Sequence, residues 1–127
     1  MNTNRFVTAN FTGQLHVSSI TMTKTHPSGN DWYARATVTV QDALGAVASG
    51  VAVTGVWTKN TSSWSNNPIS PPNTTDASGQ VTFTSATADC THGNDCTFVY
   101  RVTNLTKTNY TYNAAADVGN PGTIEAP

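Results

Sequence analysis

Residues 32–41 alternate apolar and polar side chains at every position, and this pattern constrains the fold more than any other feature. A two-residue period is that of a β-strand with one face on a core and the other in water. Threonine occupies 23 of the 127 positions and favours strands, because its branched side chain loses freedom in a helix. No window shows convincing helical spacing. The sequence therefore predicts an all-β protein.

Further segments with strand character follow one another, separated by turn residues. They are residues 15–25, 51–57, 80–85, 96–104 and 110–112, with another candidate strand at 5–11. Asp42 and Asp76 each begin an Asp-x-x-Gly sequence, in which the aspartate can accept hydrogen bonds from turn amides and the glycine can take positive φ. Short strands at this spacing predict an immunoglobulin-like antiparallel β-sandwich of about seven to eight strands.

The ends of the chain and one internal segment differ from these strands. Residues 60–73 contain three prolines, which cannot donate to a strand ladder, and predict a long loop or an irregular edge. We expect residues 1–14 to form an N-terminal extension or extra strand, residues 15–117 the sandwich, and residues 118–127 a C-terminal tail or linker. The length suits a single domain.

Several segments combine strand alternation with these turns in a recognisable way. They are residues 37–45 (TVTVQDALG), 51–57 (VAVTGVW), 75–85 (TDASGQVTFTS) and 98–112. Together they resemble the bacterial immunoglobulin-like modules, of the invasin-like or fibronectin-type-III-like kind, that are appended to secreted peptidases, glycoside hydrolases and surface proteins. The resemblance covers residues 15–117 and implies an extracellular accessory domain without catalytic residues. Residues 60–73 depart from the short glycine-rich loop expected of such a module.

The chain carries few charges: six Lys and Arg against seven Asp and Glu, for a formal net charge of −1. Phosphate binding draws its affinity from many cationic contacts, so this balance argues against a nucleic-acid partner. The sequence has no basic cluster suited to a membrane surface, and its apolar runs are too short to span a bilayer. We therefore expect neither nucleic-acid binding nor membrane insertion.

Cys90 and Cys96 are the two cysteines, and five residues separate them. In an oxidising compartment this spacing predicts a disulfide that pins the end of a hairpin. Two alternatives stay open: free thiols, and a metal site formed by the cysteines with His92 and Asp95. Calcium is a further alternative because this loop is rich in Asp and Asn, although turn formation also explains those residues. No cofactor is expected.

The sequence predicts no catalytic site. Nucleophilic catalysis needs a Ser or Cys with a base and an orienting acid, and no Gly-x-Ser-x-Gly elbow is present. A glycosidase needs two carboxylates that face each other across a cleft, whereas Asp42 and Asp76 have turn roles and Glu125 lies in the predicted tail. The three histidines lie in no recognisable catalytic context.

Aromatic side chains give the candidate ligand site. Trp64 lies in the polar loop with Asn66 and Asn67, Trp57 ends a strand, and Tyr33 faces outward from its strand. Sugar rings stack on exposed aromatic rings, and the analogous stacking of nucleobases is worth about 1–3 kcal/mol per ring. We therefore expect carbohydrate contact at these five residues. The competing interpretation is structural: Trp57 would pack at a sheet end and Trp64 would anchor its loop.

The predicted function is that of a non-catalytic extracellular module of a secreted multidomain protein. Such a module would bind polysaccharide or a cell-surface glycan, or would space a linked catalytic domain. The runner-up is a structural subunit of a surface fibre or adhesin, since a terminal strand can add to the exposed sheet edge of a neighbour. The oligomeric state separates the two, because a fibre subunit forms ordered polymers.

Overall fold

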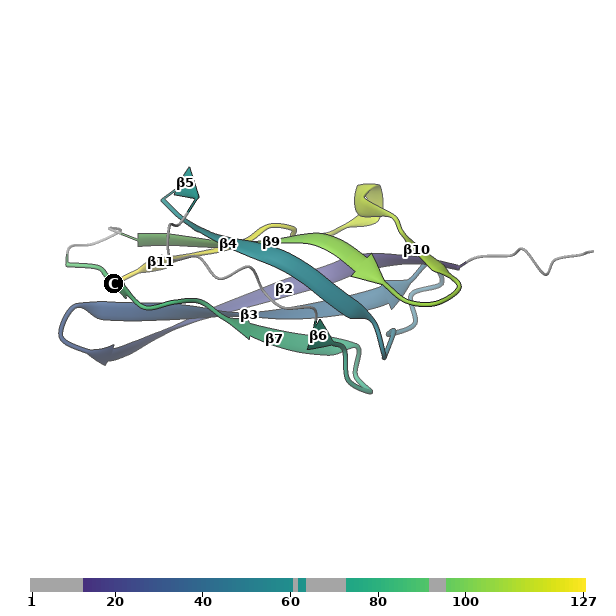
Figure 1. Cartoon of the computed structure of the whole chain (residues 1–127), viewed down its shortest axis with the longest axis horizontal. Helices are drawn as coiled ribbons and strands as arrows, with labels where there is room; N and C mark the ends of the chain where they lie inside the picture. Colours follow the sequence, from purple (N-terminus) through teal and green to yellow (C-terminus); the bar gives the residue numbers. More distant parts are fainter. Residues whose placement is uncertain (1–12, 61, 64–72, 92–95) are drawn as a thin grey trace, which may run out of the picture.

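The computed structural model describes residues 13–60, 62–63, 73–91 and 96–127. The candidate strand at 5–11 therefore lies outside the described residues. The described chain forms two β-sheets that pack face to face, with the strands running along the longest dimension of the molecule (Figure 1). The prediction of an all-β sandwich is confirmed. Among the described residues, seven strands have three or more residues and three further strands have two.

The first sheet has the order β10-β2-β3-β7. Its strands are β2 (Gly13–Ser28), β3 (Asp31–Asp42), β7 (Gln80–Thr84) and β10 (Tyr110–Tyr112), and the short β8 (Ala88–Asp89) also pairs with β3. β2 and β3 form a long antiparallel hairpin, whereas β10 pairs with β2 in parallel. This parallel pair departs from the expected antiparallel pattern, because β10 follows a strand of the other sheet and shares no hairpin with β2.

The second sheet has the order β11-β9-β4-β5 and is antiparallel throughout its described pairs. Its strands are β4 (Ala52–Lys59), β5 (Ser62–Ser63), β9 (Cys96–Thr106) and β11 (Gly122–Ala126), and β6 (Asn73–Thr74) also pairs with β4. A 3-10 helix of one turn, η1 (Ala114–Ala116), follows β10. Across the described ranges, the structure contains no helix of the length and apolarity that crossing a membrane requires.

β11 occupies residues that the sequence analysis assigned to a tail or linker. It pairs with β9 along its whole length. Gly122 and Ala126 are buried, and Ile20 and Met22 fill the space that a side chain at Gly122 would need. These residues thus form a strand rather than a tail. Two of its three inward positions, Gly122 and Ala126, hold small residues and only Ile124 is large, so the strand lacks the strong apolar alternation that marks the others.

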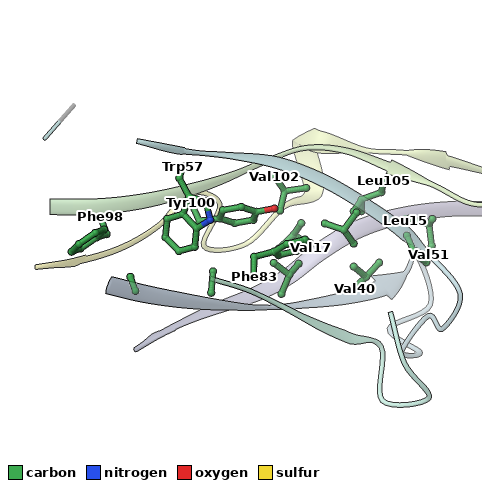
Figure 2. Close-up of a cluster of buried hydrophobic side chains, with 14 of the residues drawn as sticks. Leu15, Val17, Val40, Val51, Trp57, Phe83, Phe98, Tyr100, Val102 and Leu105 are labelled. Atoms are coloured by element: carbon green, nitrogen blue, oxygen red, sulfur yellow. The ribbon is translucent and has the colours of Figure 1, made fainter. Parts of the chain in front are cut away.

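The core lies between the two sheets, as the alternation predicts (Figure 2). Tyr100 packs against both Trp57 and Phe83, with ring centroids 4.9 Å apart in each pair. Around these rings lie further buried side chains: Leu15, Val17, Ala34, Ala36, Val38, Val40, Val51, Val53, Phe98, Val102 and Leu105. Trp32 shares the inward face of β3 but is only partly buried, because it lies near the hairpin end and stacks on the exposed His26.

Both Asp-x-x-Gly turns form as predicted. In each turn the aspartate Oδ1 accepts hydrogen bonds from the backbone N–H groups two and four residues later, at 2.9 and 3.0 Å. Gly45 and Gly79 have φ of 86° and 74°, a region that glycine enters without steric cost. The carboxylates of Asp42 and Asp76 are therefore occupied by turn amides.

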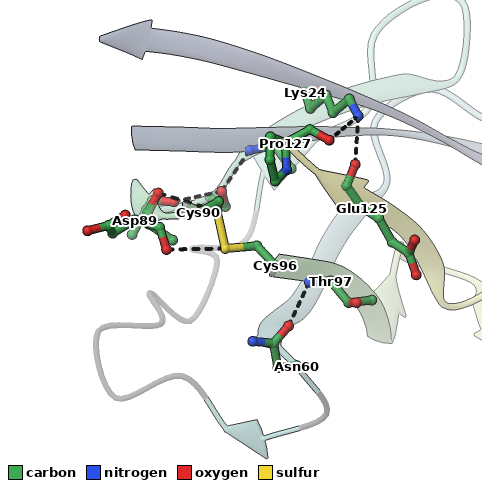
Figure 3. The surroundings of a disulfide bond; sticks show 12 residues. Lys24, Asn60, Asp89, Cys90, Cys96, Thr97, Glu125 and Pro127 are labelled. Atoms are coloured by element: carbon green, nitrogen blue, oxygen red, sulfur yellow. Dashed lines mark hydrogen bonds between the residues drawn. A yellow bond between two sulfur atoms is a disulfide. The ribbon is translucent and has the colours of Figure 1, made fainter. Parts of the chain in front are cut away.

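β2 begins and β11 ends at opposite ends of the sandwich (Figure 1). At the first end, the backbone N–H of Ala43 donates to the carbonyl of Gln14. At the other end, the Lys24 ammonium donates to the backbone oxygens of Glu125, at 2.7 Å, and Pro127, at 3.3 Å (Figure 3). The described chain therefore enters the sandwich at one end and leaves it at the other, so that its path as a whole runs lengthwise.

The predicted disulfide is confirmed and lies at the second of these ends (Figure 3). Cys90 follows β8 of the first sheet and Cys96 begins β9 of the second, with a Cα–Cα distance of 5.7 Å. The bond therefore joins the two sheets covalently. Because both sulfurs are oxidised, neither is a thiolate ligand, which excludes the four-ligand metal site considered from the sequence.

Candidate functional site

Trp57, one of the five predicted ligand residues, is fully buried in the core. Every second residue of β4 faces inward, and Trp57 is the last buried position before the strand ends. No part of its ring reaches solvent, so it cannot stack on a sugar, and the structural interpretation of this residue is correct. No described residue accepts a hydrogen bond from its indole N–H.

Three other predicted ligand residues, Trp64, Asn66 and Asn67, lie outside the described residues. Their carbohydrate-binding role stays a prediction. Asp95 and His92 of the loop between the cysteines also lie outside the described ranges.

Tyr33, the remaining predicted ligand residue, lies on the outer side of the first sheet and is partly exposed. The guanidinium carbon of Arg35 is 5.4 Å from the centre of the Tyr33 ring, and Arg35 Nη2 donates to the phenol oxygen at 3.4 Å. Such a cation–π contact holds the guanidinium over the ring. The two side chains thus form an aromatic and cationic pair on an exposed sheet surface.

The Tyr33–Arg35 pair belongs to a larger polar surface, which we name the threonine face. It comprises the outward side chains of three adjacent strands: Ser19, Thr21, Thr23 and Thr25 of β2; Tyr33, Arg35, Thr37 and Thr39 of β3; and Gln80, Thr82 and Thr84 of β7. The strand register aligns them in rows across the sheet. Thr21, Thr37 and Thr82 form one such row.

Hydrogen bonds link the threonine face between strands. The hydroxyl oxygens of Thr37 and Thr82 are 3.0 Å apart, and Gln80 Nε2 donates to the Thr39 hydroxyl at 3.3 Å. The alternation of residues 32–41 puts Thr37 and Thr39 on the same outward face as Tyr33, but it does not bring β2 and β7 beside them. Each strand carried the signal, namely threonine at alternate positions, whereas the register that aligns the strands is non-local.

Two carboxylates lie at one end of the same outer surface. Asp31 and Asp89 are direct partners in the register of β3 and β8, and both are exposed. With Arg35 as the cation of the threonine face, this side of the sheet carries more negative than positive charge. Its chemistry is therefore that of a hydroxyl-rich surface with few charges and a small negative excess.

The described residues also bear on metal binding. Within the ranges that the structure describes, no group of three or more His, Cys, Asp or Glu side chains is arranged to hold a metal ion. Asp31 and Asp89 form a pair without a third such ligand among those residues.

A second polar cluster, which we name the polar bridge, consists of Tyr112, Asp117 and Asn120. Asp117 Oδ1 accepts a hydrogen bond from the backbone N–H of Val17, at 2.7 Å, and its other oxygen accepts from Asn120, at 2.8 Å, and from the Tyr112 hydroxyl. Asn120 also exchanges two 3.0 Å hydrogen bonds with the backbone of Val102. The bridge thus ties β2 and β10 of the first sheet to β9 of the second.

The polar bridge changes the acidity of its phenol. Burial, together with the hydrogen bond to the negative Asp117, raises the pKa of Tyr112 well above its ordinary value near 10, while Asn120 opposes the shift. The phenol therefore stays neutral and acts as a donor. Since the bridge connects backbone groups of both sheets, its role is structural, and no local pattern in the sequence predicts it.

Comparisons with protein-family models, with curated proteins and with solved structures found no match to this chain. The resemblance to bacterial immunoglobulin-like modules therefore stays an expectation from the sequence. Among the described residues, the threonine face is the candidate ligand surface, and the geometry of its side chains is the evidence for it.

Proposed function

We propose that this chain is a non-catalytic accessory module of a secreted, multidomain protein, and that it binds polysaccharide while spacing a linked domain. The observation that carries this proposal is the lengthwise path of the chain. Gly13 and Pro127 lie at opposite ends of the sandwich, so a domain joined before β2 and one joined after β11 would be held apart by its full length (Figure 1).

Two further features support the proposal. The Cys90–Cys96 disulfide suits an oxidising, extracellular environment. The threonine face leaves hydroxyl groups and the Tyr33 ring on the outside of the sheet, where a glycan can reach them. The linked domain would carry the catalytic activity of the parent protein.

The glycan-binding part of the proposal is tested by affinity electrophoresis of the full chain in gels that each contain one soluble polysaccharide. We expect retarded migration in at least one gel, and isothermal titration calorimetry then gives the dissociation constant. Unretarded migration in every gel of a broad panel contradicts glycan binding and leaves the spacer role.

A structural subunit of a surface fibre or adhesin is the second candidate. Within the described residues β7 pairs on one side only, with β3, and Gln80–Thr84 contains neither a charged residue nor proline. Natural edge strands are commonly protected by such residues, so an unprotected edge can accept a strand from a neighbour. Light scattering separates the two candidates: a monomer favours the accessory module, and concentration-dependent ordered polymers favour the fibre subunit.

A further inference from the structure

We propose that the threonine face is the glycan-binding site and that it takes single chains of a neutral, soluble polysaccharide laid along β3. This inference rests on the proposed function and gives it a location and a ligand class. In this site the aromatic contact is Tyr33, because Trp57 is buried and cannot reach a ligand.

Hydrogen-bonding chemistry is the first argument. A threonine hydroxyl both donates and accepts, as a sugar hydroxyl does, so the two kinds of group are complementary in every orientation. One of the two hydroxyl groups of Thr37 and Thr82 donates to the other in their 3.0 Å hydrogen bond. The pair therefore has one O–H and several lone pairs left to bind a ligand. Thr39 accepts from Gln80 and keeps its own O–H. The centre of the face is thus ordered and still has free hydrogen-bonding capacity.

The Tyr33–Arg35 pair is the second argument. The apolar C–H side of a sugar ring packs on an aromatic ring, and the arginine N–H groups donate to sugar oxygens. Arg35 is already held over one face of the Tyr33 ring by the 5.4 Å cation–π contact, which leaves a sugar the other face, and little side-chain freedom of Arg35 is lost when a ligand binds. One stacking position beside rows of hydroxyls fits a ligand that runs along the strand.

Charge selects among polysaccharides. Asp31 and Asp89 lie at the end of the surface beyond Tyr33, and Arg35 is the single cation of the threonine face. Like charges repel, so the two carboxylates disfavour a polyanionic glycan, whereas a neutral chain meets no such penalty.

The shape of the sheet selects the physical form of the ligand. Neighbouring strands in a sheet are rotated by roughly 20–25° relative to one another, so a three-stranded face is twisted rather than flat. A single chain can follow this twist, but the flat surface of a crystalline polysaccharide would contact only part of it. We therefore expect soluble chains to bind and crystalline particles to bind weakly or not at all.

The experiment measures dissociation constants for the soluble polysaccharide that the full chain binds best. We expect Tyr33→Ala to weaken binding about tenfold or more, by analogy with lost base stacking. Arg35→Ala and the double variant Thr37→Val/Thr82→Val should each weaken it about fivefold, since each removes hydrogen bonds to the ligand. The double variant keeps β-branched side chains and removes both partners of the Thr37–Thr82 bond, so the fold should be preserved.

Matched controls lie on the outer side of the second sheet, where Arg101 and Thr103 of β9 are exposed. Arg101→Ala and Thr103→Val should leave the dissociation constant unchanged. Binding that is lost in Trp64→Ala but unchanged in the variants of the threonine face overturns this inference and leaves the proposed function intact. Stronger binding to a polyanionic or crystalline polysaccharide overturns the ligand class. Failure of the full chain to bind any polysaccharide overturns the glycan-binding function and this inference together.

Discussion

The two sheets are joined by two regions of opposite character. In the apolar core, Trp57, Tyr100 and Phe83 pack ring against ring, and burial of their surface stabilises the contact. In the polar bridge, Asp117 and Asn120 instead satisfy backbone groups of both sheets through hydrogen bonds. The comparison shows that a sandwich with a modest apolar content can add directional contacts where its core ends.

The largest effect is expected in the apolar core. Trp57→Ala should lower the free energy of unfolding by about 3–5 kcal/mol, because it leaves a large cavity beside Tyr100. Urea denaturation followed by circular dichroism measures this change. Trp32→Ala, at the partly exposed hairpin end, is the matched control and should cost less than half as much. Equal losses at the two positions would contradict the difference in their burial.

The second-largest loss of stability is expected in the polar bridge. Asp117→Ala should lower the free energy of unfolding by about 2–3 kcal/mol, because it deprives the Val17 N–H and two side chains of their acceptor. Asp76→Ala is the control: its carboxylate also accepts two backbone hydrogen bonds, but in an exposed turn, so about 1 kcal/mol or less is expected. The same denaturation assay applies, and a loss at Asp117 no larger than the loss at Asp76 would contradict the stabilising role of the bridge.

The disulfide is a third connection between the sheets, and its contribution to stability can be compared with those of the apolar core and the polar bridge. Replacing both Cys90 and Cys96 with serine should cost about 2 kcal/mol, since the loop they close is short. Thermal unfolding with and without a reductant measures the effect in the wild type. The double variant should be insensitive to the reductant, and a wild type that is equally insensitive would argue against a stabilising role for the bond.

The smallest loss of stability is expected for Tyr112, whose contribution to the polar bridge depends on pH. Tyr112→Phe should cost about 1 kcal/mol near neutral pH, where the phenol is a neutral donor. Because folding raises the pKa of Tyr112, its contribution is complete below the unfolded value near 10 and is lost as the pH rises above that value.

Stability of the wild type should therefore fall more steeply than that of Tyr112→Phe at alkaline pH. Denaturation curves collected from neutral pH to above pH 10 for both proteins measure the difference. Parallel pH profiles would indicate that the phenol titrates alike in the folded and unfolded chain.

Alternation predicted the apolar core but not the polar bridge, for a physical reason. A two-residue period is a local property, so the inward positions of β3 and β9 could be identified from their own residues. Asp117 acts on Val17, 100 positions away, and no local pattern announces such a contact. The depth of Trp57 was missed for a related reason: alternation gives the face of a side chain but not what covers it.

The candidate site, too, could be predicted only where it depends on the alternation within one strand. Tyr33 could be placed on an outward face because its neighbours on β3 alternate around it. The rows of the threonine face depend on the register of three strands, of which β7 lies about 40 residues further along the chain. β11 was missed because Gly122 and Ala126 give it too little apolar signal to be recognised as a strand.

The lengthwise path of the chain has a mechanical consequence. A pulling force applied at Gly13 and Pro127 would make β2 slide against β10 and β3, and β11 slide against β9. Under such shear, the ladder hydrogen bonds of each strand bear the load together instead of opening one after another. A module of this build would therefore resist tension along its length far better than a peeling force across it.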